Sequence, residues 1–199
     1  MKTLSIPATF FTALLLAAVP APAADTSQPW LMNPPPAEKF SSFTRFEMPN
    51  IAMFPPYAGK GPNVKALTVI QRDFTKATAP ALQAWNEAGA KAEKVRTLLI
   101  EPRVEEIKFI SGGTRFWAGG LAGDSFVRIT IKISEKETGR VIGTPMFYAK
   151  ANRMAGAWSV GATDNVMLTR VAAHMAAYVT GNYAAAVGGA TGEDPPKKK

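Results

Sequence analysis

The stretch from Ser125 to Ala151 constrains the fold of this chain more than any other part of the sequence. Apolar β-branched residues recur there at every second position, with polar residues between them: Val127, Ile129, Ile131 and Ile133 alternate with Arg128, Thr130 and Lys132. This alternation predicts a strand with one apolar and one polar face. Because Gly139 supplies a turn position that tolerates positive φ, we expect a hairpin whose second arm begins at Val141.

Two other segments have the periodicity of helices. The first runs from Val64, with Asn63 as its expected N-cap, to Gly89. Its predicted apolar stripe consists of Leu67, Ile70, Phe74, Ala77, Ala81 and Trp85. Pro80 falls within this stripe, so we expect it either to kink the helix or to begin a second one. A last helix is predicted from Thr163 or Asp164 to Gly181. Its buried side is predicted to carry Leu168, Val171, Ala172, Met175, Tyr178 and Val179.

Further strands are expected before and after the first helix. Residues 43–53 are predicted to form the first strand. Residues 95–100 have the composition of a strand, and residues 104–110 either continue it or form a second strand, with a bend at Pro102 between them. The glycine-rich stretch 111–124 is expected to connect them to the hairpin. This order predicts an α+β fold, in which two helices pack on one face of a largely antiparallel sheet.

The N-terminus has the features of a secretory signal peptide. Lys2 is a short basic region, Phe10 to Val19 is mostly apolar, and Ala21 to Ala23 is a small-residue cleavage motif. The apolar run is shorter than the roughly 20 residues of a membrane span. We therefore predict a signal peptide over residues 1–24 and export to the periplasm or beyond. A retained membrane anchor is the alternative that stays open.

Composition divides the rest of the chain into three parts. Residues 25–42 are rich in proline and are predicted to be a linker. Residues 43–183 are predicted to form the single domain. Residues 184–199 combine small residues, two prolines and three lysines, and are predicted to be a disordered basic tail. Within the linker, the residues expected to dock on the domain are Trp30, Leu31 and Met32.

The scarcity of cysteine and histidine excludes several kinds of chemistry. The chain has no cysteine, which excludes disulfides, a cysteine nucleophile and a lipid-modified N-terminal cysteine. Zinc usually requires histidine or cysteine ligands, so we predict no structural metal. We also predict no cofactor. His174 is the only histidine. It lies at the edge of the last helix's apolar stripe, so we expect a partly buried boundary residue rather than a member of a catalytic triad.

The formal net charge of +8 raises the question of an anionic partner. Lys197, Lys198 and Lys199 end the chain, and they favour weak contact with anionic lipid or acidic glycan. Such contact contributes roughly 1 kcal/mol per lysine near an anionic lipid surface. We predict no nucleic-acid partner, because a secreted protein has little access to nucleic acid.

The glycine-rich segment 112–123 contains Arg115, Phe116 and Trp117. A phosphate-binding loop would need a lysine followed by serine or threonine at the start of a helix, whereas this segment leads into a strand. Aromatic side chains beside a cation suit a protein partner or a sugar ring. We therefore predict these three residues, with Trp158, as partner-binding residues. The alternative is that the aromatic side chains fold back over the sheet.

The same region carries a resemblance to a known family. The motifs that carry it are Gly112-Gly113-Thr114-Arg115, then Gly119-Gly120-Leu121-Ala122-Gly123, and the turn Glu137-Thr138-Gly139. In these features the chain resembles an uncharacterised family of bacterial envelope proteins, the domain of unknown function numbered four-four-one-zero. The resemblance covers about residues 43–183. It implies an envelope location and an α/β body, and it supplies no activity.

Peripheral attachment to anionic lipid through the tail lysines is one hypothesis about function, and two others follow. The first is a non-enzymatic binding or assembly module, exported to the envelope, whose partner is an envelope protein or a glycan. The second is a secreted hydrolase that acts on a glycan through paired carboxylates such as Glu105 or Asp124. Glu101 and Glu105 share one strand face if Pro102 does not interrupt the strand. No catalytic motif supports the second hypothesis.

Overall fold

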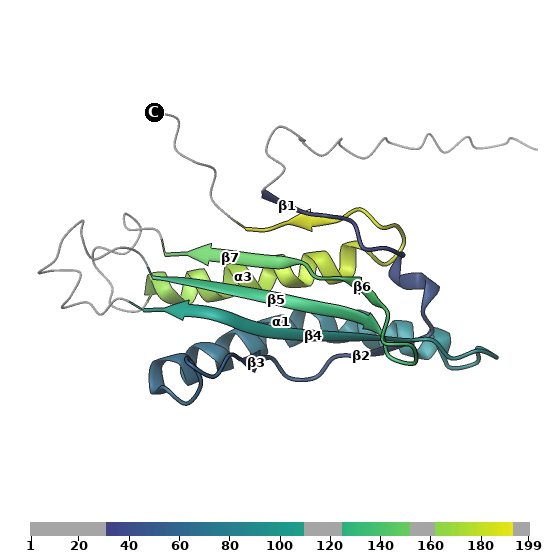
Figure 1. Cartoon of the computed structure of the whole chain (residues 1–199), viewed down its shortest axis with the longest axis horizontal. Coiled ribbons are helices and arrows are strands. Elements are labelled where there is room, and N and C mark those ends of the chain that lie inside the picture. Colours follow the sequence, from purple (N-terminus) through teal and green to yellow (C-terminus); the bar gives the residue numbers. More distant parts are fainter. Residues whose placement is uncertain (1–30, 110–124, 152–161, 193–199) are drawn as a thin grey trace, which may run out of the picture.

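A computed structural model describes residues 31–109, 125–151 and 162–192. The predicted α+β class is confirmed, and so is the largely antiparallel sheet with both helices on one side (Figure 1). The elements are β1 (Met32–Asn33), the 3₁₀ turn η2 (Phe40–Ser42), β2 (Arg45–Glu47), β3 (Ala52–Met53), α1 (Gly61–Gly89), β4 (Thr97–Lys108), β5 (Phe126–Glu135), β6 (Val141–Gly143), β7 (Met146–Lys150), α3 (Ala162–Gly181) and β8 (Gly189–Ala190).

The main sheet has six strands. β4 and β5 lie at its centre and are antiparallel, and β6 and β7 pair antiparallel with β5. β2 and β3 pair with β4 in the parallel direction. This parallel pairing follows from the chain order, because α1 connects the two short strands to β4 as a crossover helix.

The predicted hairpin is confirmed. Val127, Ile129, Ile131 and Ile133 are each 0% exposed, whereas Arg128 and Lys132 on the opposite face are exposed. Gly139 has φ of +71°, as the turn requires. The second arm is not continuous, because residues 144–145 separate β6 from β7.

β4 is one strand of 12 residues, so the second predicted stretch is the continuation of the first, and Pro102 does not interrupt it. Pro102 is opposite Ile131 in β5, and the Ile131 N–H donates to the Pro145 carbonyl, on the side away from β4. The nitrogen of Pro102 therefore faces the other edge of β4. On that edge, β2 pairs with β4 only as far as Leu99, and the pairing with β3 begins only at Arg103. The Pro102 nitrogen therefore has no neighbouring strand to which it would have to donate a hydrogen bond.

α1 begins earlier than predicted and passes through its proline. The N-cap is Lys60, and Asn63 is buried and donates from Nδ2 to the Tyr57 carbonyl instead of capping the helix. Pro80 lies inside α1 without ending it. Proline lacks the N–H that would donate to the Lys76 carbonyl one turn earlier. Both residues are exposed, so water can hydrogen-bond to that carbonyl instead.

The buried stripe of α1 is shifted from the predicted one. Ile70 and Phe74 are buried as predicted, but Ala77 is exposed. The neighbouring Thr78 is 0% exposed, and its Oγ1 donates to the Phe74 carbonyl at 2.8 Å. The stripe therefore follows a spacing of four residues: Ala66, Ile70, Phe74, Thr78 and Leu82. The helix ends at Gly89, as predicted.

α3 packs against α1 and β7, and all six residues predicted for its buried side are buried. No helix in the described parts of the chain is long and apolar enough to span a membrane.

The predicted linker and tail are parts of the folded body where the structure describes them. β1 and β8 pair antiparallel, with Met32 opposite Ala190. Phe40 is 0% exposed, and its N–H donates to the Asn182 carbonyl. The Tyr178 hydroxyl donates to the Pro34 carbonyl at 3.0 Å. These contacts correct the predicted boundaries at residues 42 and 184. The predicted signal peptide and residues 193–199 lie outside the described residues.

Candidate functional site

The residues predicted to bind a partner all lie outside the described residues. They are Arg115, Phe116, Trp117 and Trp158. The same holds for Asp124 of the hydrolase hypothesis and for the tail residues Lys197, Lys198 and Lys199. The described residues that adjoin these segments nevertheless form a distinct arrangement at one end of the sheet.

Three strands meet at this end, where β4 ends, β5 begins and β7 ends. In the sheet register, Phe126 is the direct neighbour of Lys108 on one side and of Lys150 on the other. The adjacent residues Ile107, Val127 and Ala149 are buried toward the helices. Because side chains alternate along a strand, the three side chains lie on the opposite face. We call Lys108, Phe126 and Lys150 the Lys–Phe–Lys row.

A second row of residues lies beside it on the same face. Arg128 is opposite Glu106 on β4 and Tyr148 on β7, and its Nη2 donates to Glu106 Oε2 at 2.7 Å. The rings of Phe126 and Tyr148 have centroids 5.8 Å apart and are inclined by 31°. The two rings form one partly exposed aromatic surface beside the lysines.

Charge on this face is unevenly compensated. Each carboxylate contributed by β4 has a cation next to it: Glu101 pairs with Lys132, Glu105 with Arg103 and Glu106 with Arg128. Among the described residues, by contrast, no carboxylate forms an ion pair with Lys108 or Lys150. The Lys–Phe–Lys row is therefore the part of this face that can attract an anion without breaking an existing pair.

The environment of Glu105 does not favour the hydrolase hypothesis. Burial raises the pKa of Glu105, but the hydrogen bond from Thr130 and the ion pair with Arg103, 2.8 Å long, lower it further than burial raises it. A catalytic acid for glycoside hydrolysis needs a raised pKa so that it carries a proton near neutral pH. Glu105 is instead held as a carboxylate.

His174 is partly buried on α3, as predicted. Its pKa is lowered from the ordinary value, first by burial and then by the positive charge of Arg170 one turn earlier. A carboxylate partner of the kind found in a catalytic triad would raise that pKa. His174 packs instead against the backbone at Gly192, where an added Cβ would lie 2.8 Å from His174 Cδ2.

Side-chain amides occupy backbone groups at two outer edges of the main sheet. On β2, Asn86 of α1 accepts from the Phe46 N–H at 2.7 Å and donates to the Phe46 carbonyl at 3.1 Å. On β7, Asn33 makes the same two contacts with Met146, at 2.7 and 2.9 Å. Each asparagine thus occupies the backbone groups through which an added strand would pair.

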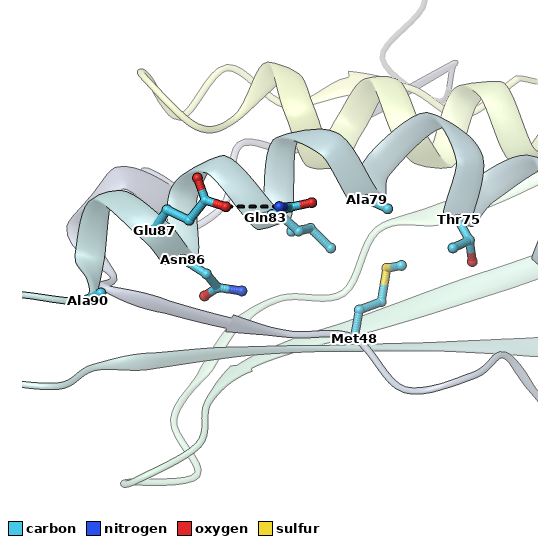
Figure 2. A pocket seen from close by; sticks show the side chains of 8 residues that line it. Met48, Thr75, Ala79, Gln83, Asn86, Glu87 and Ala90 are labelled. Carbon is cyan, nitrogen blue, oxygen red and sulfur yellow. Dashed lines mark hydrogen bonds between the residues drawn. The ribbon is translucent and has the colours of Figure 1, made fainter.

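A shallow groove lies on the helix side of the sheet, between α1 and the chain that follows β2. Its volume is about 640 Å³. Figure 2 shows Met48 pointing toward α1, and Gln83 donating to Glu87 on the rim, at 2.9 Å. The lining is mostly apolar and consists of Met48, Thr75, Ala79, Leu82, Gln83, Asn86, Glu87 and Ala90. One carboxylate is too few for a paired-acid mechanism. Within the described ranges, no cluster of acidic residues and histidine could hold a metal ion.

Comparison with known proteins does not assign the chain to a family. No family model and no curated protein matches it, so membership of the family it resembles stays a prediction. Its fold is similar to solved structures at low identity. The PelC dodecamer from Paraburkholderia phytofirmans is 16% identical, with 77% of this chain and 95% of that chain covered and a TM-score of 0.39.

Two further structures show the same degree of similarity. A hypothetical protein from Chlamydia trachomatis is 11% identical, with coverage of 70% of this chain and 97% of that chain and a TM-score of 0.40. A Xanthomonas campestris protein of the DUF330 family is 10% identical, with 74% and 87% coverage and a TM-score of 0.37. None of these likenesses carries a function to this chain.

Proposed function

We propose that this protein is an exported, non-enzymatic binding module of the bacterial envelope, and that its partner docks over the Lys–Phe–Lys row. The observation that carries the proposal is the arrangement of that row. An aromatic side chain lies between two lysines on the face of the sheet away from the helices, and neither lysine has an ion-pair partner among the described residues. Interfaces are enriched in aromatic residues, and unpaired surface charge speeds association with a partner of opposite charge.

Export is supported by the N-terminal sequence. Lys2, the apolar stretch from Phe10 to Val19 and the small residues from Ala21 to Ala23 follow the order of a secretory signal peptide. This sequence has no cysteine, so the proposal includes no lipid-modified cysteine. The proposed location is therefore the periplasm or the outside of the cell, with no lipid anchor on cysteine.

The partner-binding residues predicted from the sequence belong to segments that adjoin the same end of the sheet. The segment with Arg115, Phe116 and Trp117 connects β4 to β5, and the segment with Trp158 follows β7. Both therefore begin within a few residues of the Lys–Phe–Lys row. We include these four residues in the proposed binding surface, with the tail lysines as a weak additional contact for an anionic partner.

The proposal is tested by recovering partners from envelope extract with the mature protein. The test variant carries Lys108→Glu and Lys150→Glu. The control carries Lys65→Glu and Lys91→Glu, which change the net charge equally at exposed positions on α1 and just after it. The test variant should lose specifically bound partners while the control keeps them, and both should melt at the same temperature as the wild type. Recovery of the same partners by all three proteins would contradict the proposal.

A further inference from the structure

Resting on the proposed function, we infer that the partner is an acidic glycan, a polysaccharide whose sugars carry carboxylates, lying across the strands over the Lys–Phe–Lys row. A sugar ring stacks on Phe126, and carboxylates on its two sides pair with Lys108 and Lys150. This assignment rests on the spacing of the row, its unpaired charge, and the features of the fold that disfavour a peptide.

The spacing of the row suits a linear polymer. Neighbouring strands lie about 4.8 Å apart, so the backbones that carry the two lysines are about 10 Å apart with Phe126 midway between them. A ligand across the strands therefore meets a cation, a flat apolar ring and a second cation in that order. A polysaccharide with carboxylates on its sugars offers the matching order of an anion, the apolar face of a ring and another anion.

The aromatic surface extends beyond one ring. Tyr148 lies diagonally next to Phe126, with 5.8 Å between the ring centroids. Together the two rings offer an apolar surface wide enough to contact a sugar and the next sugar of the same polymer. Burial of the apolar face of a sugar against these rings removes apolar area from water, which favours binding independently of charge.

The charges explain why the ligand must be anionic. Beside the row, Arg128 is already paired with Glu106, 2.7 Å away. Lys108 and Lys150 have no such partner among the described residues, so ion pairs with a ligand carboxylate form without breaking pairs in the protein. Because exposed ion pairs are individually weak and screened by salt, affinity should depend on several contacts and fall as salt rises.

The fold disfavours an extended peptide as the partner. An added β-strand needs a free sheet edge, and Asn33 and Asn86 occupy the backbone groups at Met146 on β7 and Phe46 on β2. The Lys–Phe–Lys row is on the flat face of the sheet, where main-chain groups are already paired between strands. Recognition there relies on side chains alone, which suits ring stacking and charge pairing.

The test measures binding of the full mature protein to three probes by calorimetry at low and high salt. The probes are an oligogalacturonate, a neutral oligogalactan of the same length, and an oligoglutamate of the same charge. The wild type should bind the oligogalacturonate about tenfold or more tightly than either other probe, a difference of about 1.4 kcal/mol or more. The double variant Lys108→Glu, Lys150→Glu should bind the oligogalacturonate more weakly by a similar factor. The control variant Lys65→Glu, Lys91→Glu should bind it as the wild type does.

Phe126→Ala separates a glycan from a merely acidic ligand. It should weaken oligogalacturonate binding while leaving any oligoglutamate binding unchanged. Equal binding of both acidic probes, unaffected by Phe126→Ala, would overturn the glycan assignment in favour of an acidic protein surface. Absence of oligogalacturonate binding, with envelope partners still lost in the row variant, would overturn the inference and leave the proposed function standing. If the row variant kept its envelope partners and its oligogalacturonate binding, the inference and the proposed function would both be wrong.

Discussion

Arg96 donates from Nε to Glu135 Oε1 at 2.7 Å, and this ion pair joins the start of β4 to the end of β5. Arg96 also donates to Glu38 at 3.1 Å, and its guanidinium lies 4.4 Å from the centre of the Phe43 ring. Arg140 also forms ion pairs with both carboxylates. The four charged groups thus fasten the segment before β2 to the hairpin.

We expect this cluster to make stability depend on acid pH. The Arg96 hydrogen bond lowers the pKa of Glu135 from 4.5 to about 2, with Thr138 and Arg140 acting in the same direction against desolvation. A lowered folded-state pKa stabilises the fold fully above about pH 4.5, and that contribution is lost as the pH falls toward 2. Thermal unfolding followed from pH 7 to pH 2 should show this decline.

The matched variant for this measurement is Glu135→Gln. It cannot ionise, so its melting temperature should already be lower at pH 7 and should change less between pH 4.5 and pH 2 than that of the wild type. A pH profile of the variant parallel to that of the wild type would show that other carboxyl groups, such as Glu38, carry the acid sensitivity.

Asn33→Ala should destabilise the protein by about 1–3 kcal/mol, because it leaves both backbone groups of Met146 without their partner. The same change should speed hydrogen exchange at the Met146 amide and promote self-association through the opened edge of β7. Chemical denaturation, amide exchange and light scattering measure these effects. Asn33→Asp keeps the acceptor and loses the donor, so it should leave the Met146 amide protected from exchange. Loss of that protection in Asn33→Asp would contradict the hydrogen bond from the Met146 N–H to Asn33 Oδ1.

Gly89→Ala should destabilise the fold by about 1–3 kcal/mol or more, the typical cost of forcing extra atoms into a packed site. An added Cβ at Gly89 would lie 1.9 Å from the Thr44 carbonyl oxygen, which is backbone and has little freedom to move. The control is Gly181→Ala at the end of α3, where an added Cβ meets nothing within 4 Å. Alanine there should be neutral or stabilise by up to about 1 kcal/mol. Similar denaturation midpoints for the two variants would contradict the close approach.

The corrected stripe of α1 is tested by a pair of neighbouring substitutions. Ala77→Glu should change the free energy of unfolding by less than about 0.5 kcal/mol, because Ala77 is exposed. Thr78→Glu places a carboxylate at a position that is 0% exposed and should cost several kcal/mol or prevent folding. A larger loss of stability in urea for Ala77→Glu than for Thr78→Glu would place the buried stripe where the sequence predicted it.

The expected elements were predictable wherever one face of an element is buried along its whole length. The alternation from Val127 to Ile133 and the apolar side of α3 are local patterns, and both are confirmed. The stripe of α1 was harder to predict, because alanine and threonine carry little hydrophobic signal and either Ala77 or Thr78 fits a helical spacing. The sequence left open whether the strand continues through Pro102, because the cost of a proline depends on which edge of the strand its nitrogen faces.

In the candidate site, too, local sequence patterns were visible in advance and contacts between strands were not. Arg115, Phe116, Trp117 and Trp158 stood out in the sequence because aromatic residues beside a cation in a glycine-rich stretch are conspicuous. Lys108, Phe126 and Lys150 did not, because each is ordinary in its own segment. Cross-strand register places these three side by side. The one usable signal was the parity of the hairpin, which already assigns Phe126 to the polar face.

By itself, the sequence determined the α+β class, the hairpin and the last helix, since periods of two and of three to four residues are properties of neighbours along the chain. Only the tertiary structure decided that Met32 pairs with Ala190, that asparagines occupy backbone groups at two sheet edges, and that two lysines flank Phe126. These contacts join residues far apart in the chain. They depend on strand register and on packing between elements, which no local pattern encodes.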